Sequence, residues 1–403
     1  MQTKNISSLP HVDCCGCRAC GDVCPVNCIS FVKDDEGFMF PAVNEEVCIQ
    51  CGKCQKICPE FHPNFHPKAV DVTAAYAESA EVRQSGSSGG IFPLLAEKIL
   101  AMGGKVWGAA FTNELQVIHQ CASNVSELQP LLRSKYVQSN PSGAYAQIKE
   151  DVAHGIMTLF SGTPCQCNAV RNVVGDSPLL YTVEVVCHGV PSQDLFDRSI
   201  KWFEEKHNCT VTRFTFRSKP AGAKHPQAYS IEYACGFKVH NKNGLHYQFP
   251  YYFGFQKYMT LRQSCYTCKW AQPKRTADIT LGDFWGIEKY NSTLDAKTGV
   301  SQVICNTEKG RELVDSLIRE NEIFSENFPI DVAIENNGCL KAPTKLKPSR
   351  AAFFKALQEE PFDEVVKKYL TSNRKFIFDL YYAIPGPLRR IVRRLMDKHM
   401  SYE

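Results

Sequence analysis

The 403-residue sequence lacks the features that mark several protein classes. It contains no stretch approaching the roughly 18 to 20 apolar residues that span a bilayer, and residues 1–10 lack the apolar core of a signal peptide. The net charge is only +4, from 46 Lys and Arg against 42 Asp and Glu, so nucleic acid is not an expected partner. The sequence therefore predicts a cytoplasmic globular protein of two or three domains.

Cysteine, in contrast, is abundant. The chain has 20 cysteines, and ten of them fall between Cys14 and Cys58. A reducing compartment makes disulfides a poor explanation for this density. We therefore interpret these cysteines first as metal ligands.

Two copies of the spacing C-x2-C-x2-C-x3-C-P occur, over residues 14–25 and 48–59. This is the bacterial ferredoxin spacing, in which three thiolates hold one [4Fe-4S] cluster and the fourth reaches the other cluster. Zinc knuckles would need other spacings. The predicted ligand sets are Cys14, Cys17, Cys20 with Cys58, and Cys48, Cys51, Cys54 with Cys24. Cys15 and Cys28 lie outside the pattern and are predicted to be buried beside the clusters, and residues 31–40 should form a hairpin.

The chain divides into three predicted regions. Residues 1–62 form an α+β ferredoxin-like domain that ends in a Pro/His linker. Residues 70–340 alternate strand and helix patterns, which predicts a mixed α/β domain with a mainly parallel sheet. Within it, residues 211–255 resemble a β-rich insertion whose last strand covers 247–253. Residues 341–403 form a basic, helical C-terminal extension.

A Gly/Ser-rich loop precedes a predicted helix near residue 92. Ser87 or Ser88 is the expected N-cap, and such a loop offers backbone N–H groups and the helix dipole to an anion. Taken alone, the loop is better explained as an ordinary capped helix. It is not a GxGxxG fingerprint, so it does not predict a Rossmann NAD site.

Four further cysteines lie in three loops. Cys165 and Cys187 each follow a buried strand, and parallel strands would bring both to the carboxyl edge of the sheet. Cys265 and Cys268 form a C-x2-C pair. These four predict a third [4Fe-4S] cluster, with zinc or unliganded thiols as alternatives. The remaining cysteines lack ligand spacing and are predicted to be buried: Cys121, Cys167, Cys209, Cys235, Cys305 and Cys339.

Several motifs together resemble the coenzyme F420 hydrogenase/dehydrogenase beta-subunit family, where F420 is a deazaflavin. They cover residues 134–139, 162–166, 187–189 and 265–286, and the N-terminal cysteines resemble the branch fused to a ferredoxin domain. The resemblance implies an FAD-binding domain that exchanges hydride with a partner and single electrons with iron-sulfur clusters. The implied flavin contacts are Ser87, Ser88, Gly89, Gly90, Lys135, Gly162 and Thr163.

Other residues are weaker candidates for the chemistry. His188 is a candidate proton donor, with a structural role as the alternative. A set of basic residues could hold an anionic substrate or the partner: Arg217, Lys219, Lys224, Lys274 and Arg275.

The resulting functional hypothesis is an FAD- and iron-sulfur-dependent oxidoreductase acting on an organic substrate or a deazaflavin-like cofactor. One alternative is an electron-transfer subunit that serves a donor or acceptor protein. Another is an accessory redox protein in cell-surface polysaccharide biosynthesis. Basic and apolar residues alternate at helical spacing over 388–396, which predicts either peripheral contact with the inner membrane surface or a docked helix.

Overall fold

The computed structural model describes residues 4–219, 227–296, 298–372 and 384. Its contacts divide the chain into two compact units. Unit 1 comprises Met1–Gln193 and Leu261–Lys345, and unit 2 comprises Asp194–Thr260 and Leu346–Glu403. The ferredoxin-like segment and the large sheet therefore belong to the same unit.

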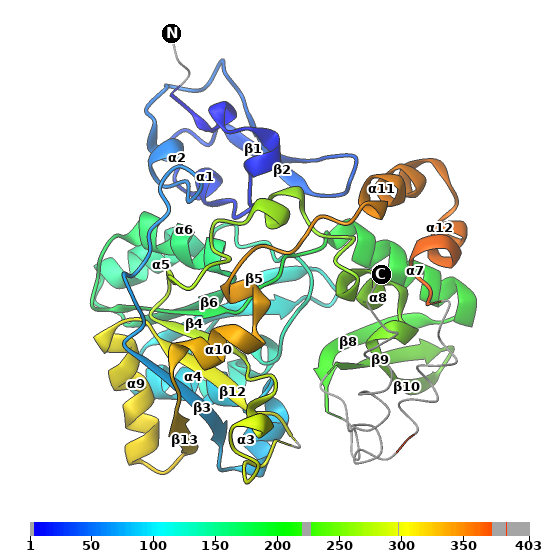
Figure 1. Cartoon of the computed structure of the whole chain (residues 1–403). Coiled ribbons are helices and arrows are strands. Elements are labelled where there is room, and N and C mark those ends of the chain that lie inside the picture. The colour runs from blue at the N-terminus through cyan, green and yellow to red at the C-terminus, as the bar shows by residue number, and fades with distance from the viewer. Residues whose placement is uncertain (1–3, 220–226, 297, 373–383, 385–403) are drawn as a thin grey trace. The chain divides into compact units, whose positions relative to one another are not determined.

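The ferredoxin-like segment is built from two short helices and one hairpin (Figure 1). These elements are α1 (Ala19–Asp22), β1 (Ile29–Lys33), β2 (Met39–Val43) and α2 (Lys53–Lys56). The two strands pair antiparallel, with Ile29 opposite Val43, which confirms the predicted hairpin. Each helix begins after a residue with a left-handed backbone conformation, which is Arg18 for α1 and Gly52 for α2. The two residues occupy the same position in the two cysteine runs. The internal repeat of the sequence is thus a repeat of local backbone structure.

The large sheet of unit 1 has eight strands in the order β13-β3-β12-β11-β7-β6-β4-β5 (Figure 1). The strands are β3 (Asp71–Ala77), β4 (Lys105–Phe111), β5 (Val117–Ala122), β6 (Thr158–Gly162), β7 (Leu180–Val185), β11 (Ile279–Asp283), β12 (Ser301–Cys305) and β13 (Ile323–Asn327). Only β4, β6, β7 and β11 pair in parallel; the other four pairings are antiparallel. The predicted mainly parallel sheet is corrected to a mixed sheet, because short connections such as that between β4 and β5 permit only antiparallel pairing.

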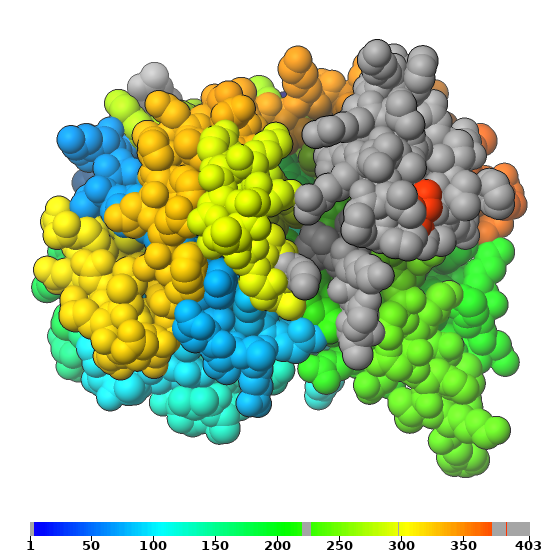
Figure 2. Space-filling view, turned by 60° about the horizontal axis from the view of Figure 1, so that its bottom comes forward, coloured from blue at the N-terminus to red at the C-terminus, as the bar shows by residue number. Residues whose placement is uncertain are grey.

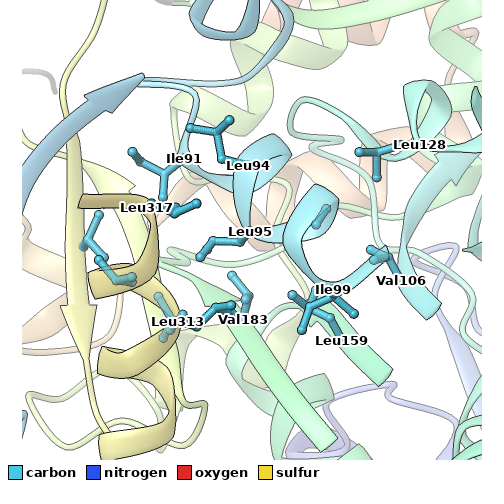
Figure 3. Packing of buried hydrophobic residues seen from close by; sticks show 14 of the residues in the cluster. Ile91, Leu94, Leu95, Ile99, Val106, Leu128, Leu159, Val183, Leu313 and Leu317 are labelled. Carbon is cyan, nitrogen blue, oxygen red and sulfur yellow. The ribbon is translucent and has the colours of Figure 1, made fainter. Parts of the chain in front are cut away.

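Helices cover both faces of this sheet. They are α3 (Ala80–Ser85), α4 (Ile91–Ala101), α5 (Ala144–Ala153), α6 (Pro164–Val174), α9 (Glu308–Arg319) and α10 (Ile330–Asn336). On β6, Leu159 packs in the core with α4 and α9, whereas the next residue, Phe160, packs with α5 and α6. Figure 3 shows Leu95 of α4 and Leu313 of α9 converging on Val183 of β7. Because successive strand residues point to opposite faces, unit 1 is a three-layer α/β structure.

Helix α3 is tied to the segment between β11 and β12. Arg83 of α3 donates to Gly299 O at 2.8 Å and pairs with Asp295 at 3.0 Å. Figure 2 shows this side of unit 1, where residues near 290–340, in yellow and orange, border the light-blue region of β3 and α3. These contacts join α3, near the start of the sheet domain, to a segment more than 200 residues later in the chain.

Unit 2 contains α7 (Gln193–His207), β8 (Thr210–Ser218), β9 (Ala228–Cys235), β10 (Lys238–Leu245), α8 (Pro250–Gln256), α11 (Ser349–Glu359) and α12 (Phe362–Tyr369). The three strands form an antiparallel sheet, as expected for the β-rich insertion. The predicted strand over 247–253 is wrong, because Pro250 begins a helix there; proline has no N–H to lose and its φ suits the first turn.

Two helices, α11 and α12, lie in the predicted C-terminal extension. The amphipathic pattern over 388–396 lies outside the described residues. Within the part of the chain that the structure describes, no helix is both long and apolar enough to cross a membrane.

Candidate functional site

Two cavities in the ferredoxin-like segment are each bordered by one predicted cysteine set. The first cavity is lined by Cys14, Cys17, Cys20 and Cys58. The second cavity is lined by Cys24, Cys48, Cys51 and Cys54. Each cysteine run therefore contributes its fourth member to the other cavity, as the ferredoxin spacing predicts. Thiols around two largely apolar cavities fit two [4Fe-4S] clusters.

Each cavity is also bordered by a fifth cysteine. Cys28 is buried, and its Sγ lies 3.4 Å from Sγ of Cys24. Cys15 is buried at the first cavity and packs in one core with Cys17 and with Cys165, which lies on the sheet domain. The predicted burial of both residues is confirmed. Cys15 also provides a direct contact between the two cysteine-rich parts of unit 1.

The structure brings together the four cysteines predicted for a third cluster. Cys165 is the second residue of α6, directly after β6, and Cys187 follows the neighbouring parallel strand β7. The loop after Cys187 approaches Cys265 so closely that a Cβ at Gly189 would lie 3.0 Å from Cβ of Cys265. Burial and the neighbouring thiols Cys265, Cys165 and Cys268 together raise the pKa of Cys187. Four neighbouring, partly buried thiols fit a soft metal centre.

These thiols are not arranged around a single point. Among residues 4–219, 227–296 and 298–372, no three His, Cys, Asp or Glu side chains converge as ligands of one metal ion. Zinc would hold each sulfur at about 2.3 Å, whereas a [4Fe-4S] cluster binds its four thiolates through separate irons. The four cysteines are therefore spread more widely than the ligands of a single metal ion.

Arg262 anchors the ferredoxin-like segment to the sheet domain. The side chain is fully buried and donates from Nε to Cys14 O at 2.6 Å and from Nη2 to Met39 O at 3.1 Å. Its guanidinium also lies 4.0 Å from the ring centroid of Phe40. Gly16 has φ +71°, and a Cβ there would lie 2.7 Å from Nη1 of Arg262. The first cysteine loop thus needs glycine to accept the arginine.

The stretch predicted as a linker is held along the same surface. Asn64 N donates to Asn168 Oδ1 at 2.8 Å, and His66 N donates to Arg275 O at 2.8 Å. Lys269 pairs with Glu60 at 3.0 Å. The Pro/His stretch is therefore a fixed connection within unit 1.

A buried ion pair supports the segment after Cys268. Glu184 on β7 and Arg275 are both almost fully buried, and the carboxylate accepts from Arg275 Nε and from Thr280 Oγ1 at 2.8 Å. Arg275 also donates to Trp270 O at 2.7 Å. Arg275, predicted to belong to an anion-binding set, has an internal partner instead; Lys224 of that set lies outside the described residues. The role of Glu184 was not predicted, although a charged residue inside an apolar strand was the available sequence signal.

The Gly/Ser loop differs from its predicted anion-binding role. Helix α4 begins at Ile91 with Gly90 as N-cap, so the predicted serine N-cap is wrong. The left-handed φ of +79° at Gly90 suits glycine at this position. Gly89 N donates to Ser301 Oγ at 2.9 Å, and Gly90 N donates to Ser87 O at 3.0 Å. A Cβ on Gly89 would lie 2.4 Å from Ala75 O. The two glycines therefore serve close packing, and their N–H groups have internal partners.

The other predicted flavin contacts lie around one edge of the sheet. Ser87 Oγ accepts from Ser134 N at 3.1 Å, next to Lys135, whose Nζ donates to Leu132 O at 2.8 Å. Burial lowers the pKa of Lys135 to about 7. His119 lies between Lys135 and the residues before Gly162 and Thr163. Its Nε2 lies 3.1 Å from Ser161 O. Burial, with a smaller contribution from Lys135, lowers the pKa of His119 to about 4.

His188 and the unassigned cysteines have simpler environments. Burial lowers the pKa of His188 to about 4, so its imidazole is neutral at pH 7 and is a poor proton donor there. Cys167 and Cys305 are buried as predicted. The prediction is wrong for four others, which lie at strand ends, on an edge strand or in connections and are only partly buried: Cys121, Cys209, Cys235 and Cys339.

Comparison with known proteins agrees with this arrangement. Residues 13–61 match the family described as 4Fe-4S dicluster domain. Residues 157–329 match the family described as the C terminus of the beta subunit of coenzyme F420 hydrogenase/dehydrogenase. The chain thus joins a 4Fe-4S dicluster domain to the C-terminal region of the F420 hydrogenase/dehydrogenase beta-subunit family, which confirms the resemblance. It is an iron-sulfur redox protein related to that beta subunit.

Two individual relatives are similar to different shares of the chain. A protein named Ferredoxin 7Fe from Hydrogenibacillus schlegelii is 38% identical over 53 residues, which are 12% of this chain. The chain spans 62% of that relative's length. A structure titled as the F420-reducing [NiFe] hydrogenase complex from Methanosarcina barkeri aligns with a TM-score of 0.43 at 18% identity, over 74% of this chain and 91% of that one.

Proposed function

We propose that this protein is an iron-sulfur flavoprotein oxidoreductase with two ferredoxin-type [4Fe-4S] clusters, a third cluster and FAD. When bound, the clusters would supply one-electron transfer, and FAD would couple single electrons to hydride exchange with an organic substrate or a deazaflavin-like cofactor. The observation that carries the proposal is the packing of Cys15 and Cys17 in one core with Cys165. It places the first cysteine cavity directly beside the cysteines of the sheet domain.

The protein's own residues would hold these groups in fixed positions. Arg262 fastens the first cysteine loop through Cys14 O, and Glu184 with Arg275 supports the segment that carries Cys268. Burial around Cys165 excludes water from the contact between the cysteine sets. The flavin would lie against Ser87, Lys135, Gly162 and Thr163, with Gly89 and Gly90 shaping the loop behind them.

A redox partner protein is the second element of the proposal. At the second cavity Cys51 is exposed, and Ile49 beside it is 61% exposed. An apolar side chain next to an exposed ligand suits brief contact with an electron donor or acceptor protein. If that contact is the main role, the chain acts as an electron-transfer subunit, which is the alternative function.

Metal analysis tests the three-cluster proposal. Anaerobically reconstituted full-length protein should contain about twelve iron, and Cys265→Ser should contain about eight, because one cluster needs four thiolates. Cys167→Ser removes a buried thiol outside the set and should leave the iron content unchanged. About eight iron in both the wild type and Cys265→Ser, or one zinc per chain, would contradict the third cluster.

FAD binding is tested by fluorescence titration. Lys135→Met should weaken binding by about tenfold or more, because the side chain is a cation at the proposed flavin site and a lost charged hydrogen bond costs about 1.5–3 kcal/mol. Lys149→Met changes an exposed lysine on α5 and should bind FAD like the wild type. A folded wild-type protein that never takes up FAD would refute the flavin assignment while leaving the clusters in place.

A further inference from the structure

Tyr145 is a buried donor next to the cysteine sets. Its side chain is fully buried at the start of α5, and its hydroxyl has no hydrogen-bond partner among the residues that the structure describes. The residue packs in one core with Cys15, Cys17 and Cys165. A buried, unpaired hydroxyl costs about 1–3 kcal/mol, so a position of this kind calls for an explanation.

The backbone fixes Tyr145 against the first cysteine loop. Asp22, the last residue of α1, accepts from Gly143 N at 2.8 Å and from Tyr145 N at 3.2 Å. Helix α1 begins two residues after Cys17, so these bonds tie the start of α5 to the loop that carries this thiol. On its other side the tyrosine ring packs against Phe160 of β6, with 5.8 Å between the ring centroids. The ring is therefore held between the sheet and the cysteines.

The other donors of this core include the indole of Trp270, which has a partner, and the indole of Trp107, which has none among the residues that the structure describes. The indole N–H of Trp270 donates to Asn168 Oδ1 at 3.2 Å. The cysteine sulfurs close to Tyr145 can accept hydrogen bonds, and they accept more strongly once they are thiolates bound to iron. A tyrosine hydroxyl has an ordinary pKa of about 10, so it keeps its proton near neutral pH and can donate.

We propose that the Tyr145 hydroxyl donates a hydrogen bond to the Cys17 thiolate and so raises the reduction potential of the cluster in the first cavity. Hydrogen bonds to the sulfurs are one of the factors that set the potential of an iron-sulfur cluster. The bond stabilises the more negative, reduced form more than the oxidised form. Tyr145 is thus a positioning residue that tunes this centre, and the inference rests on the clusters of the proposed function.

The test compares full-length, reconstituted wild type and Tyr145→Phe by EPR-monitored redox titration. This substitution removes only the hydroxyl, so the iron content should be unchanged and the potential of one cluster should become more negative. Tyr181→Phe is the matched control, because Tyr181 lies on β7 and packs in the opposite core with α4 and α9. Its potentials should equal those of the wild type.

The same substitution in a second variant, Cys265→Ser, identifies which sulfur accepts the hydrogen bond from Tyr145. In Cys265→Ser, which removes a ligand of the proposed third cluster, Tyr145→Phe should still shift the potential if Cys17 accepts the hydrogen bond. Loss of the shift in that background would move the acceptor to Cys165 and overturn the assignment. Unchanged potentials in Tyr145→Phe with full iron content would show that another group satisfies the hydroxyl. A wild type that takes up no iron would overturn the clusters as well, and iron analysis separates these cases.

Discussion

Replacing Glu184 with glutamine should lower the free energy of unfolding by about 3–5 kcal/mol, because it leaves the Arg275 guanidinium buried without its counter-charge. Both side chains are almost completely buried, and the carboxylate also accepts from Thr280 Oγ1 and from Ala277 N at 3.2 Å. A glutamine amide cannot accept all of these bonds. Urea denaturation of the wild type and the variant measures the difference.

Two comparisons separate the buried pair from a general charge effect. Glu308→Gln breaks an exposed pair with Arg311 on α9 and should cost less than about 1 kcal/mol. The double variant with Glu184→Met and Arg275→Met removes both charges and should recover much of the lost stability. A cost below about 1 kcal/mol for Glu184→Gln would show that the pair is not important for stability. Glu184→Gln should also lose iron first from the third cluster site. Arg275 donates to Trp270 O just after Cys268, so a displaced Arg275 disturbs the segment that carries this cysteine.

Arg262→Ala should release the ferredoxin-like segment from the sheet domain and destabilise the protein by about 4 kcal/mol or more. The variant loses three hydrogen bonds from a charged donor, each contributing about 1.5–3 kcal/mol, and leaves a cavity beside Phe40. The bonds join the arginine to Cys14 O, Gln138 Oε1 and Met39 O. Limited proteolysis should then cut near residues 60–67, which are held in place in the intact protein.

Ser264→Ala provides the matched control for this prediction. Ser264 Oγ donates to the same carbonyl of Cys14 at 3.1 Å, and its loss should cost only about 1 kcal/mol. Arg262→Lys keeps the charge but cannot reproduce the planar fork, so it should resemble the alanine variant in its protease sensitivity. If both Arg262 variants resist protease as well as the wild type does, other contacts are sufficient to hold the ferredoxin-like segment.

Local patterns in the sequence were enough to predict the ferredoxin-like segment. Its ligand spacing and hairpin depend on residues within about 45 positions of one another, and the spacing itself encodes the exchange of Cys24 and Cys58 between the two sets. The structure places both cysteines at the expected cavities. The β-rich insertion was predictable for the same reason, except where Pro250 starts a helix in an aromatic run.

Several predictions failed where tertiary packing competes with a local pattern. The Gly/Ser loop has the composition of an anion site, yet Gly89 is required by its close approach to Ala75 O on β3. The basic run near Arg275 is similar to a surface patch, yet its arginine is buried against Glu184. In both cases a partner lies on a strand far away in the sequence, Ser301 on β12 for Gly89 and Glu184 on β7 for Arg275, so no local pattern could indicate it.

The sequence by itself determined the class of redox centre, the two N-terminal cysteine sets with their hairpin, and the resemblance to the F420 hydrogenase/dehydrogenase beta-subunit family. Only the tertiary structure decided the order of the mixed sheet, in which β13 pairs with β3. It alone also decided the Cys15 to Cys165 contact and the burial of Arg262 between Cys14 and Gln138. The physical reason is that spacing and periodicity constrain neighbours along the chain, whereas these contacts arise when distant segments exclude water from a shared core and must satisfy one another's polar groups.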